Sequence, residues 1–290
     1  MKTNKVLILG AYGFLGTYLS SHLLESGFQV LRQGRNLDAD FKINLESKDE
    51  LIIFLNTNRP NAIINLIALT DVDYCEKFPN TSFISNSKIV GNISSAIMAF
   101  EFKTRFIHVS TDQVYNGDGN HSEDIVNPLN VYGITKYLGE RMINSDLNHI
   151  ILRTNFVAKN YLMNNSFSDW LLSSATNKNE ITIFNDIFFN PLHISTLCNL
   201  ISKYIINSNI TGTFNLGSNN GTSKAQFALM FIEKLKITNN FIVGKSTKFN
   251  FAAKRPKNMT TNLSLFEEKF DLKLPDFKNE INKLSAQYLK

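Results

Sequence analysis

Short apolar runs alternate with amphipathic stretches along the first half of this chain. The apolar runs predict strands over Lys5–Leu9, Phe28–Arg32, Asn61–Ile67, Arg105–Ser110 and His149–Arg153. The stretches between them predict helices over Phe14–Ser26, Lys48–Asn58, Thr81–Phe102 and Val131–Ile143. Strands and helices that alternate in this way form a parallel sheet with helices on both faces. The predicted fold class is therefore α/β, with a doubly wound parallel sheet.

The second half of the chain has a looser pattern. After about Phe156 the residues Asn, Ser and Phe become frequent, and we interpret Trp170 and most of these phenylalanines as core residues. Neither a low-complexity linker nor a repeat separates the halves. We therefore expect residues 1–155 to form the main domain and residues 156–290 to form a small C-terminal lobe interleaved with it. The elements predicted in this half are strands near Ile181–Phe184 and Gly212–Leu216 and helices near Leu192–Ile206 and Lys224–Lys236.

Composition and charge change this picture little. The 290 residues are 43% hydrophobic and 19% charged, which is ordinary for a globular protein. The formal net charge is +5, but the basic residues are scattered and the longest basic cluster is Lys254–Lys257. Without a recognition motif, this excess does not predict a nucleic-acid partner. It suits an enzyme that binds phosphate groups.

Targeting, membrane and metal signals are weak. The apolar run Val6–Leu9 follows lysines as in a signal peptide, but it breaks at Gly10 and no cleavage site follows. No segment approaches the roughly 20 apolar residues that span a bilayer. Cys75 and Cys198 lie far apart, and no histidine pair has metal-ligand spacing. We expect a cytoplasmic protein that has no membrane span, no disulfide and no metal site.

A glycine motif follows the first predicted strand and opens the first predicted helix. Gly10 permits a tight turn, Gly13 lets the backbone approach a pyrophosphate, and Gly16 lets the helix pack against the sheet. The N-terminus of the helix offers N–H groups and a positive dipole end to phosphates. The motif predicts a Rossmann-type dinucleotide site in residues 1–155. The residues between the glycines are expected to contact the cofactor as well: Tyr12, Phe14 and Leu15.

The end of the second predicted strand bears on the choice of cofactor. Sites for NAD place an acidic residue here to hold the ribose 2′-OH, but residues 30–35 contain no carboxylate. Arg32 and Arg35 could instead bind a 2′-phosphate. We therefore predict that NADP(H) is preferred over NAD(H); the alternative is that both arginines are solvated surface residues. Asn44, with its neighbour Leu45, is expected beside the adenine.

The candidate catalytic residues follow the fourth predicted strand. Ser110, Thr111 and Asp112 stand at its carboxyl end, where ligands of open α/β sheets bind. Tyr132 and Lys136 lie four residues apart and share a helix face. The ammonium is expected to lower the pKa of the phenol toward the working pH. The phenol could then exchange a proton with a carbonyl or alcohol oxygen that Thr111 also binds, while the cofactor carries the hydride.

These motifs, in this order, resemble the extended short-chain dehydrogenase/reductases, and most of all the dTDP-4-dehydrorhamnose reductase branch. The likeness runs along nearly the whole chain. It is carried by the glycine motif, Asn65–Glu76, Ser110–Gly117, Tyr132–Lys136, Arg153-Thr154, Asn185-Asp186 with Pro191, and Arg255–Asn258.

The resemblance implies an NAD(P)-dependent oxidoreductase that reduces the C4 ketone of a nucleotide-linked deoxysugar, in polysaccharide biosynthesis. It implies that Thr111, Tyr132 and Lys136 carry out the chemistry. Further cofactor contacts are expected from Ala68, Leu69, Asn86 and Ser110, and from the catalytic Tyr132 and Lys136 as well. Substrate contacts are expected from Thr70, Val72, Asp73, Asp112, Gln113, Phe156, Phe189 and Arg255.

The chain departs from that family's pattern in the sugar pocket. Gln113 stands where the family has an aromatic residue, and Phe156 stands where it has a tryptophan. Ile187 and Phe189 replace a glutamine and a glycine. These changes predict a sugar pocket of different shape.

Two other functions remain open from the sequence. An epimerase of the same fold could use the same Thr111, Tyr132 and Lys136, whereas a dehydratase is disfavoured because Gln113 cannot take up a proton. A catalytically silent NADP-binding regulatory subunit is the other alternative. A homodimer that pairs through the helices predicted at Thr81–Phe102 and Val131–Ile143 is a further expectation.

Overall fold

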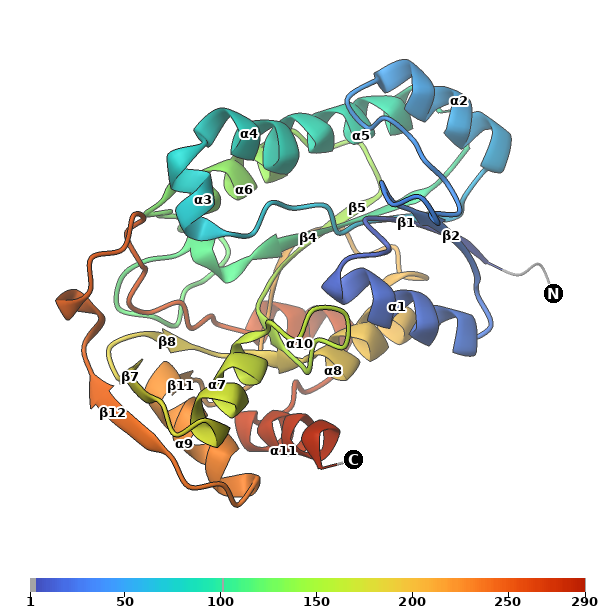
Figure 1. Ribbon diagram of the computed structural model, residues 1–290. Coiled ribbons are helices and arrows are strands. Elements are labelled where there is room, and N and C mark those ends of the chain that lie inside the picture. The colour runs from blue at the N-terminus through green and yellow to red at the C-terminus, as the bar shows by residue number, and fades with distance from the viewer. Residues whose placement is uncertain (1–3, 101, 290) are drawn as a thin grey trace.

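The computed structural model describes residues 4–100 and 102–289 and contains a six-stranded parallel sheet (Figure 1). Its strand order is β10-β5-β4-β3-β1-β2. The predicted α/β fold is confirmed, and the five strands predicted in the first half are all present. The strands are β1 (Lys5–Leu9), β2 (Gln29–Gln33), β3 (Ala62–Asn65), β4 (Arg105–Thr111), β5 (His149–Thr154) and β10 (Gly212–Leu216).

Helices cover both faces of the sheet (Figure 1). In β1, Val6 and Ile8 pack toward one face, whereas Leu7 and Leu9 pack toward the other, and all four side chains are fully buried. A strand buried on both faces reads as a continuous apolar run, which explains the signal in the sequence. The first face is covered by α1 (Phe14–Glu25), α8 (Ile194–Leu200) and α10 (Ser264–Phe270), and the second by α2 (Lys48–Asn58), α5 (Ile89–Met98) and α6 (Val131–Arg141).

The helix predicted over Thr81–Phe102 is not a single helix. The Asp71 side chain caps an earlier helix, α3 (Val72–Lys77), by accepting from the Tyr74 N–H. After α4 (Pro79–Phe83), the chain widens into a π-helical segment at Ile84–Lys88 before α5 begins. Such π segments are frequent at functional sites. None of the helices in the described part of the chain is long and apolar enough to cross a membrane.

Residues beyond 155 build a lobe and also complete the main sheet. The lobe has its own core, in which Leu171, Phe227 and Ile281 are buried. However, β10 pairs with β5, and α8 packs on α1, so the two parts of the chain are interleaved. The predicted helix Leu192–Ile206 begins two residues later, at Ile194, and ends in a π turn. The lobe contains α7 (Phe167–Thr176), α9 (Lys224–Lys234), α11 (Phe277–Tyr288), and the pairs β7 (Glu180–Phe184) with β12 (Asn240–Gly244) and β8 (Phe188–Phe189) with β11 (Thr222–Ser223); β6 (Phe156–Val157) and β9 (Leu192–His193) join it to the sheet.

Candidate active site

The glycine turn sits between β1 and α1, as its spacing predicts. Gly10 has a φ of +81°, a conformation that favours glycine, and its N–H donates to Gln33 Oε1 at 3.1 Å. A Cβ at Gly16 would overlap the Gly10 carbonyl oxygen and the Ala11 backbone, so only glycine lets α1 approach the turn. Gly13 is the N-cap of α1 and makes no side-chain cap. The free N–H groups there fit the phosphates of a dinucleotide.

A cavity of about 520 Å³ opens where the carboxyl ends of the strands meet. Its walls come from the glycine turn, the segments after β3, β4 and β5, and one face of α6. Its size and position fit a nicotinamide beside a sugar ring. The predicted site residues that line it are Gly13, Phe14, Leu15, Ala68, Thr70, Ser110, Thr111, Asp112, Gln113, Tyr132, Lys136 and Phe156.

The three candidate catalytic side chains lie together on this cavity. The Thr111 hydroxyl lies beside the Tyr132 phenol, and Lys136 Nζ donates to the Val109 carbonyl at 2.9 Å. Burial, above all, raises the pKa of Tyr132, and burial lowers the pKa of Lys136 to about 8 against the opposing pull of Glu140. The expectation that Lys136 lowers the pKa of the phenol is therefore wrong for this structure, because desolvation dominates. Tyr132 is held as a protonated phenol that can donate.

A buried ion pair fixes the elements that carry these groups. Arg153 on β5 contacts the Glu140 carboxylate on α6 at 2.7 Å, and both side chains are almost inaccessible. The Ser110 hydroxyl donates to the same carboxylate, and Arg153 also donates to the Tyr115 hydroxyl at 2.7 Å. Ser110 thus borders the cavity while its hydroxyl is engaged with Glu140. The network links β4, β5 and α6; Glu140 was not singled out from the sequence, and Tyr115 was noted only as part of the family motif.

Asn86 fixes the loop after β3 and does not line the cavity. Its side chain is fully buried in the π-helical segment, where it accepts from the Leu69 N–H at 2.8 Å and donates to the Leu69 carbonyl at 3.1 Å. The neighbours of Leu69, Ala68 and Thr70, both face the cavity. Asn86 and Leu69 therefore fix the loop whose neighbouring residues form the cavity wall.

The two arginines predicted to meet a 2′-phosphate differ. Arg32 forms a two-pronged pair with Asp40 at 2.9 Å, and the Tyr12 hydroxyl contacts the same carboxylate at 3.0 Å. Arg35 is exposed, with no hydrogen-bond partner in the described ranges. Gln33, which ends β2 beside Gly10, is buried. Arg32 already has its Nε and Nη2 donors engaged with Asp40, whereas the guanidinium of Arg35 is not engaged in this way.

The residues predicted beside the adenine lie outside the cavity. The Asn44 side chain accepts from the Glu46 N–H at 3.1 Å and so closes a local turn. Leu45 is buried in the core between the sheet and α2. Neither side chain is among those that line the cavity, so their contact with a cofactor stays a prediction.

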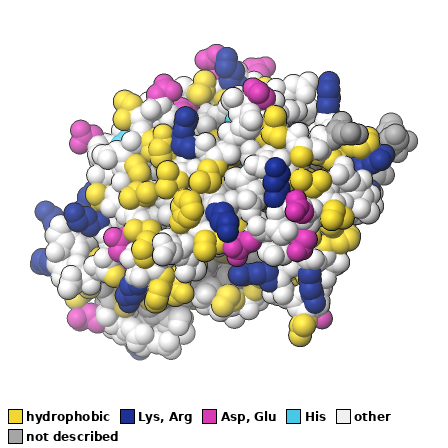
Figure 2. Space-filling view, turned by 90° about the horizontal axis from the view of Figure 1, so that it is seen from above, with side chains coloured by type: hydrophobic (Ala, Val, Ile, Leu, Met, Phe, Trp, Pro, Cys, Tyr) yellow, Lys and Arg dark blue, Asp and Glu magenta, His cyan; other side chains and the backbone are white. Residues whose placement is uncertain are grey.

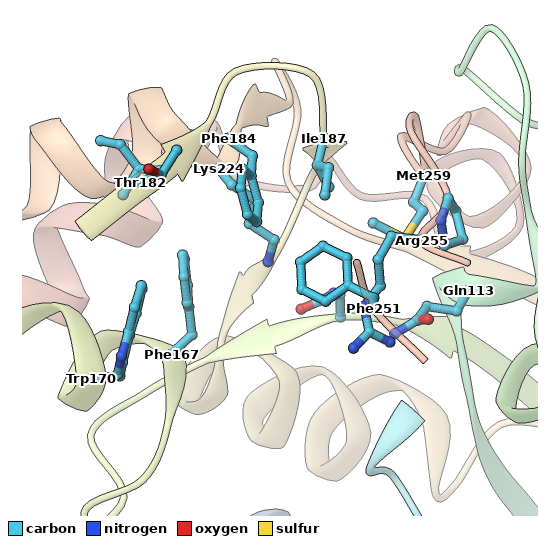
Figure 3. Close-up of a pocket in the computed structure, with 13 residues that line it drawn as sticks. Gln113, Phe167, Trp170, Thr182, Phe184, Ile187, Lys224, Phe251, Arg255 and Met259 are labelled. Atoms are coloured by element: carbon cyan, nitrogen blue, oxygen red, sulfur yellow. The ribbon is translucent and has the colours of Figure 1, made fainter. Parts of the chain in front are cut away.

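A second cavity, of about 250 Å³, adjoins the first and reaches into the lobe (Figure 3). The two cavities share Gln113, Asn155 and Phe167. Arg255 reaches the second cavity and bonds the Asp73 carboxylate at 2.6 Å. Its other walls are mostly apolar, and the remaining residues are Trp170, Thr182, Ile183, Phe184, Ile187, Lys224, Phe251, Pro256 and Met259.

Two aromatic residues lie elsewhere than expected. Phe189 is fully buried in the lobe core against Phe227 and does not reach the cavity, so the prediction that it binds substrate is wrong for this structure. Trp170 is 44% exposed and lines the second cavity, so it is not a core residue.

Val72 and Asp73 also lie off the cavity walls. Val72 opens α3, and Asp73 accepts from Ala253 N–H and from Arg255. Asp73 therefore holds Arg255 at the wall of the second cavity. Lys224 was missed, because a single lysine after a helix cap belongs to no motif and only the packing of the lobe brings it to the cavity.

Comparison with known proteins places these features in a family. The model of the RmlD substrate binding domain matches residues 4–290. The dTDP-4-dehydrorhamnose reductase of Shigella flexneri is 30% identical over 96% of this chain and 96% of that protein. The spore coat polysaccharide biosynthesis protein SpsK of Bacillus subtilis is 25% identical over 91% of each.

Solved structures share the fold over the whole chain. The dTDP-4-dehydrorhamnose reductase of Bacillus anthracis in complex with NADP gives a TM-score of 0.87, with 23% identity over 98% of this chain and 99% of that one. MoeE5 in complex with UDP-glucuronic acid and NAD gives 0.82, with 19% identity and the same coverage of each chain. Both likenesses concern the architecture.

Proposed function

This chain belongs to the family of the RmlD substrate binding domain, and we propose on that premise that it reduces the C4 ketone of a nucleotide-activated deoxysugar with a nicotinamide cofactor. The observation that carries the proposal is the grouping of Thr111, the protonated Tyr132 and Lys136 on a cavity that begins at the glycine turn. Relatives named as dTDP-4-dehydrorhamnose reductases support reduction over epimerisation.

We assign each side chain a step from its position in the cavity. Tyr132, which its raised pKa keeps protonated, donates its phenolic proton to the ketone oxygen as the hydride reaches the carbon. Thr111, beside the phenol, orients the same oxygen. The Lys136 ammonium lies one helical turn from Tyr132 and lines the same cavity, where we assign it to holding the cofactor and not to shifting the pKa of the phenol. When bound at the glycine turn, a reduced nicotinamide supplies the hydride.

We propose further that NADPH is the preferred cofactor. The end of β2 presents Gln33, Gly34 and Arg35 beside the glycine turn and lacks the carboxylate that holds a ribose 2′-OH. Arg35 is free to pair with a 2′-phosphate. We expect Arg35→Ala to weaken NADPH binding about tenfold and to leave NADH binding unchanged, as measured by fluorescence titration. Tighter binding of NADH than of NADPH by the unchanged protein would contradict the proposal.

The activity is tested by following NADPH oxidation with a panel of nucleotide-linked 4-keto-6-deoxysugars. We expect turnover with at least one sugar, and a loss of roughly 10²- to 10⁴-fold in Tyr132→Phe, which keeps the ring but cannot donate the proton. NADPH titration of the variant is the control for folding. Tight NADPH binding without oxidation of any sugar would overturn the proposal.

A further inference from the structure

Lys224 is a cation that the proposed chemistry leaves without a role. It is the first residue of α9, and it is half-buried at the wall of the second cavity. Its Nζ lies 3.5 Å from the centre of the Phe189 ring and 4.6 Å from that of Phe167. Throughout the described ranges its ammonium has no hydrogen-bond acceptor and no ion-pair partner, whereas its backbone N–H donates to the Ile187 carbonyl. Two aromatic faces therefore hold the ammonium in place without using its N–H donors.

Burial of the Lys224 side chain disfavours its charged form. Burial lowers the pKa of Lys224 to about 8, and the nearby Asp112 carboxyl opposes that shift. Asp112 lines the first cavity, where Asn155 donates to it at 2.9 Å. Lys224 thus stands beyond the catalytic end of the site, on the lobe side of Asp112. A desolvated ammonium with unused donors is a strong binding site for an anion that can enter.

The second cavity carries positive charge without a carboxylate on its described walls. Lys224 and Arg255 point into the same space beside the Phe251 ring (Figure 3). The charge of Arg255 is already matched by Asp73 at 2.6 Å. The charge of Lys224 is not matched by a contact of this kind, so it makes the larger net contribution to attracting an anion. The aromatic walls beyond, Phe184 and Trp170 among them, suit the flat face of a base.

The arrangement of the two cavities fixes which part of a substrate reaches Lys224. The first cavity holds Thr111 and Tyr132, so it must take the ketone carbon. Lys224 lines only the second cavity, which joins the first through Gln113, Asn155 and Phe167. A nucleotide sugar whose ring lies at Tyr132 must extend its diphosphate and nucleoside through that junction.

We propose that Lys224 binds the diphosphate of the substrate, so that the second cavity takes the nucleoside diphosphate half of a nucleotide sugar. The inference rests on the proposed function, because it assumes that the sugar lies in the first cavity. Lys224 is thereby a substrate-binding residue that sets affinity and takes no part in proton transfer.

The test measures the binding of two probes, dTDP and UDP, by titration calorimetry. The methionine side chain in Lys224→Met fits between the same rings without charge. We expect this variant to bind the tighter of the two probes at least tenfold more weakly than the unchanged protein. Lys224→Arg should restore most of that affinity. The matched control is Lys234→Met at the exposed position in the last turn of the same helix, which removes the same charge outside the cavity and should change binding less than twofold. NADPH binding should be equal in all variants.

The outcomes separate this inference from the proposed function. Weaker binding in Lys224→Met alone supports the inference, even if the unchanged protein reduces none of the sugars tested. Unchanged dTDP and UDP binding in Lys224→Met, or an equal loss in Lys224→Met and Lys234→Met, overturns it. If the protein reduces a sugar, Lys224→Met should raise KM at least tenfold and change kcat less than threefold; a fall in kcat alone would also overturn it.

Discussion

The protonation of single buried groups sets the chemistry of this site. Tyr132 and Asp112 are both buried near the reacting position, and desolvation raises the pKa of each, that of Asp112 to about 6. A sequence pattern can place an ammonium near a phenol, but it cannot give the depth of burial that outweighs it. The raised pKa keeps Tyr132 protonated, so the phenol carries the proton that reduction of a ketone consumes.

The raised pKa of Asp112 predicts a dependence of stability on pH. Because its folded pKa of about 6 exceeds the ordinary value of 3.8, the folded chain holds a proton that the unfolded chain releases between these values. Stability is therefore lost as the pH rises through this window. We expect Asp112→Asn to raise the free energy of unfolding by about 1–3 kcal/mol at pH 7, and by clearly less at pH 4.5. Urea denaturation at both pH values measures the free energy of unfolding of each protein. An equal difference between variant and unchanged protein at the two pH values would rule this explanation out.

At the scale of elements, the site depends on how β4, β5 and α6 are held together. The Glu140–Arg153 pair connects β5 to α6, and the Ser110 hydroxyl adds the end of β4 to the same carboxylate. The π-helical segment and Asn86 hold the loop after β3 in a similar way. These contacts keep Thr111, Tyr132 and Lys136 in fixed relation, which proton transfer at a single oxygen requires.

Breaking the buried pair is expected to be costly. Glu140→Gln leaves the Arg153 guanidinium buried without its counter-charge, so we expect a loss of about 3–5 kcal/mol in the free energy of unfolding. The comparison is Lys88→Met, which removes the exposed pair between Lys88 and Glu46. That change should cost less than about 1 kcal/mol. Urea denaturation measures the free energy of unfolding of both variants. Similar losses in the two would show that the burial of Arg153 does not require the Glu140 charge.

At the scale of the whole molecule, apolar side chains gather on the helical face above the sheet (Figure 2). They come from α3, α4 and α6, which pack against one another. Contiguous exposed apolar surface of this kind often marks an interface between subunits. The exposed residues are Tyr74, Phe78, Phe83, Ile134, Leu138 and Met142.

We expect this face to pair two copies of the chain into a homodimer. Leu138→Glu places a charge on the face and should shift the protein to a monomer, since burying that charge costs more than the contact gains. Leu229→Glu is the matched control, because Leu229 on α9 is as exposed as Leu138, at 39%, but lies in the lobe. Light scattering after gel filtration gives the mass of each variant. A monomeric unchanged protein at micromolar concentration would refute the expectation.

The sequence by itself determined the local features of this protein. Strands buried on both faces appear as apolar runs, helix α2 is bounded by a serine cap and a proline, and the glycine turn needs residues without a Cβ. Tyr132 and Lys136 share a helix face because of their spacing alone. These properties depend on neighbours in the chain, so the pattern of residues is sufficient to predict them.

The burial and pairing of side chains that are distant in the chain could be decided only by the tertiary structure. In the folded chain, β10 is the edge strand beside β5, and Phe189 lies in the core of the lobe. Trp170 is exposed, and Arg32 is paired with Asp40. The fold also brings Lys224 on α9 to a cavity that it shares with Gln113. Burial and pairing arise from side chains brought together across the sheet and the lobe, and no local pattern records which of them will meet.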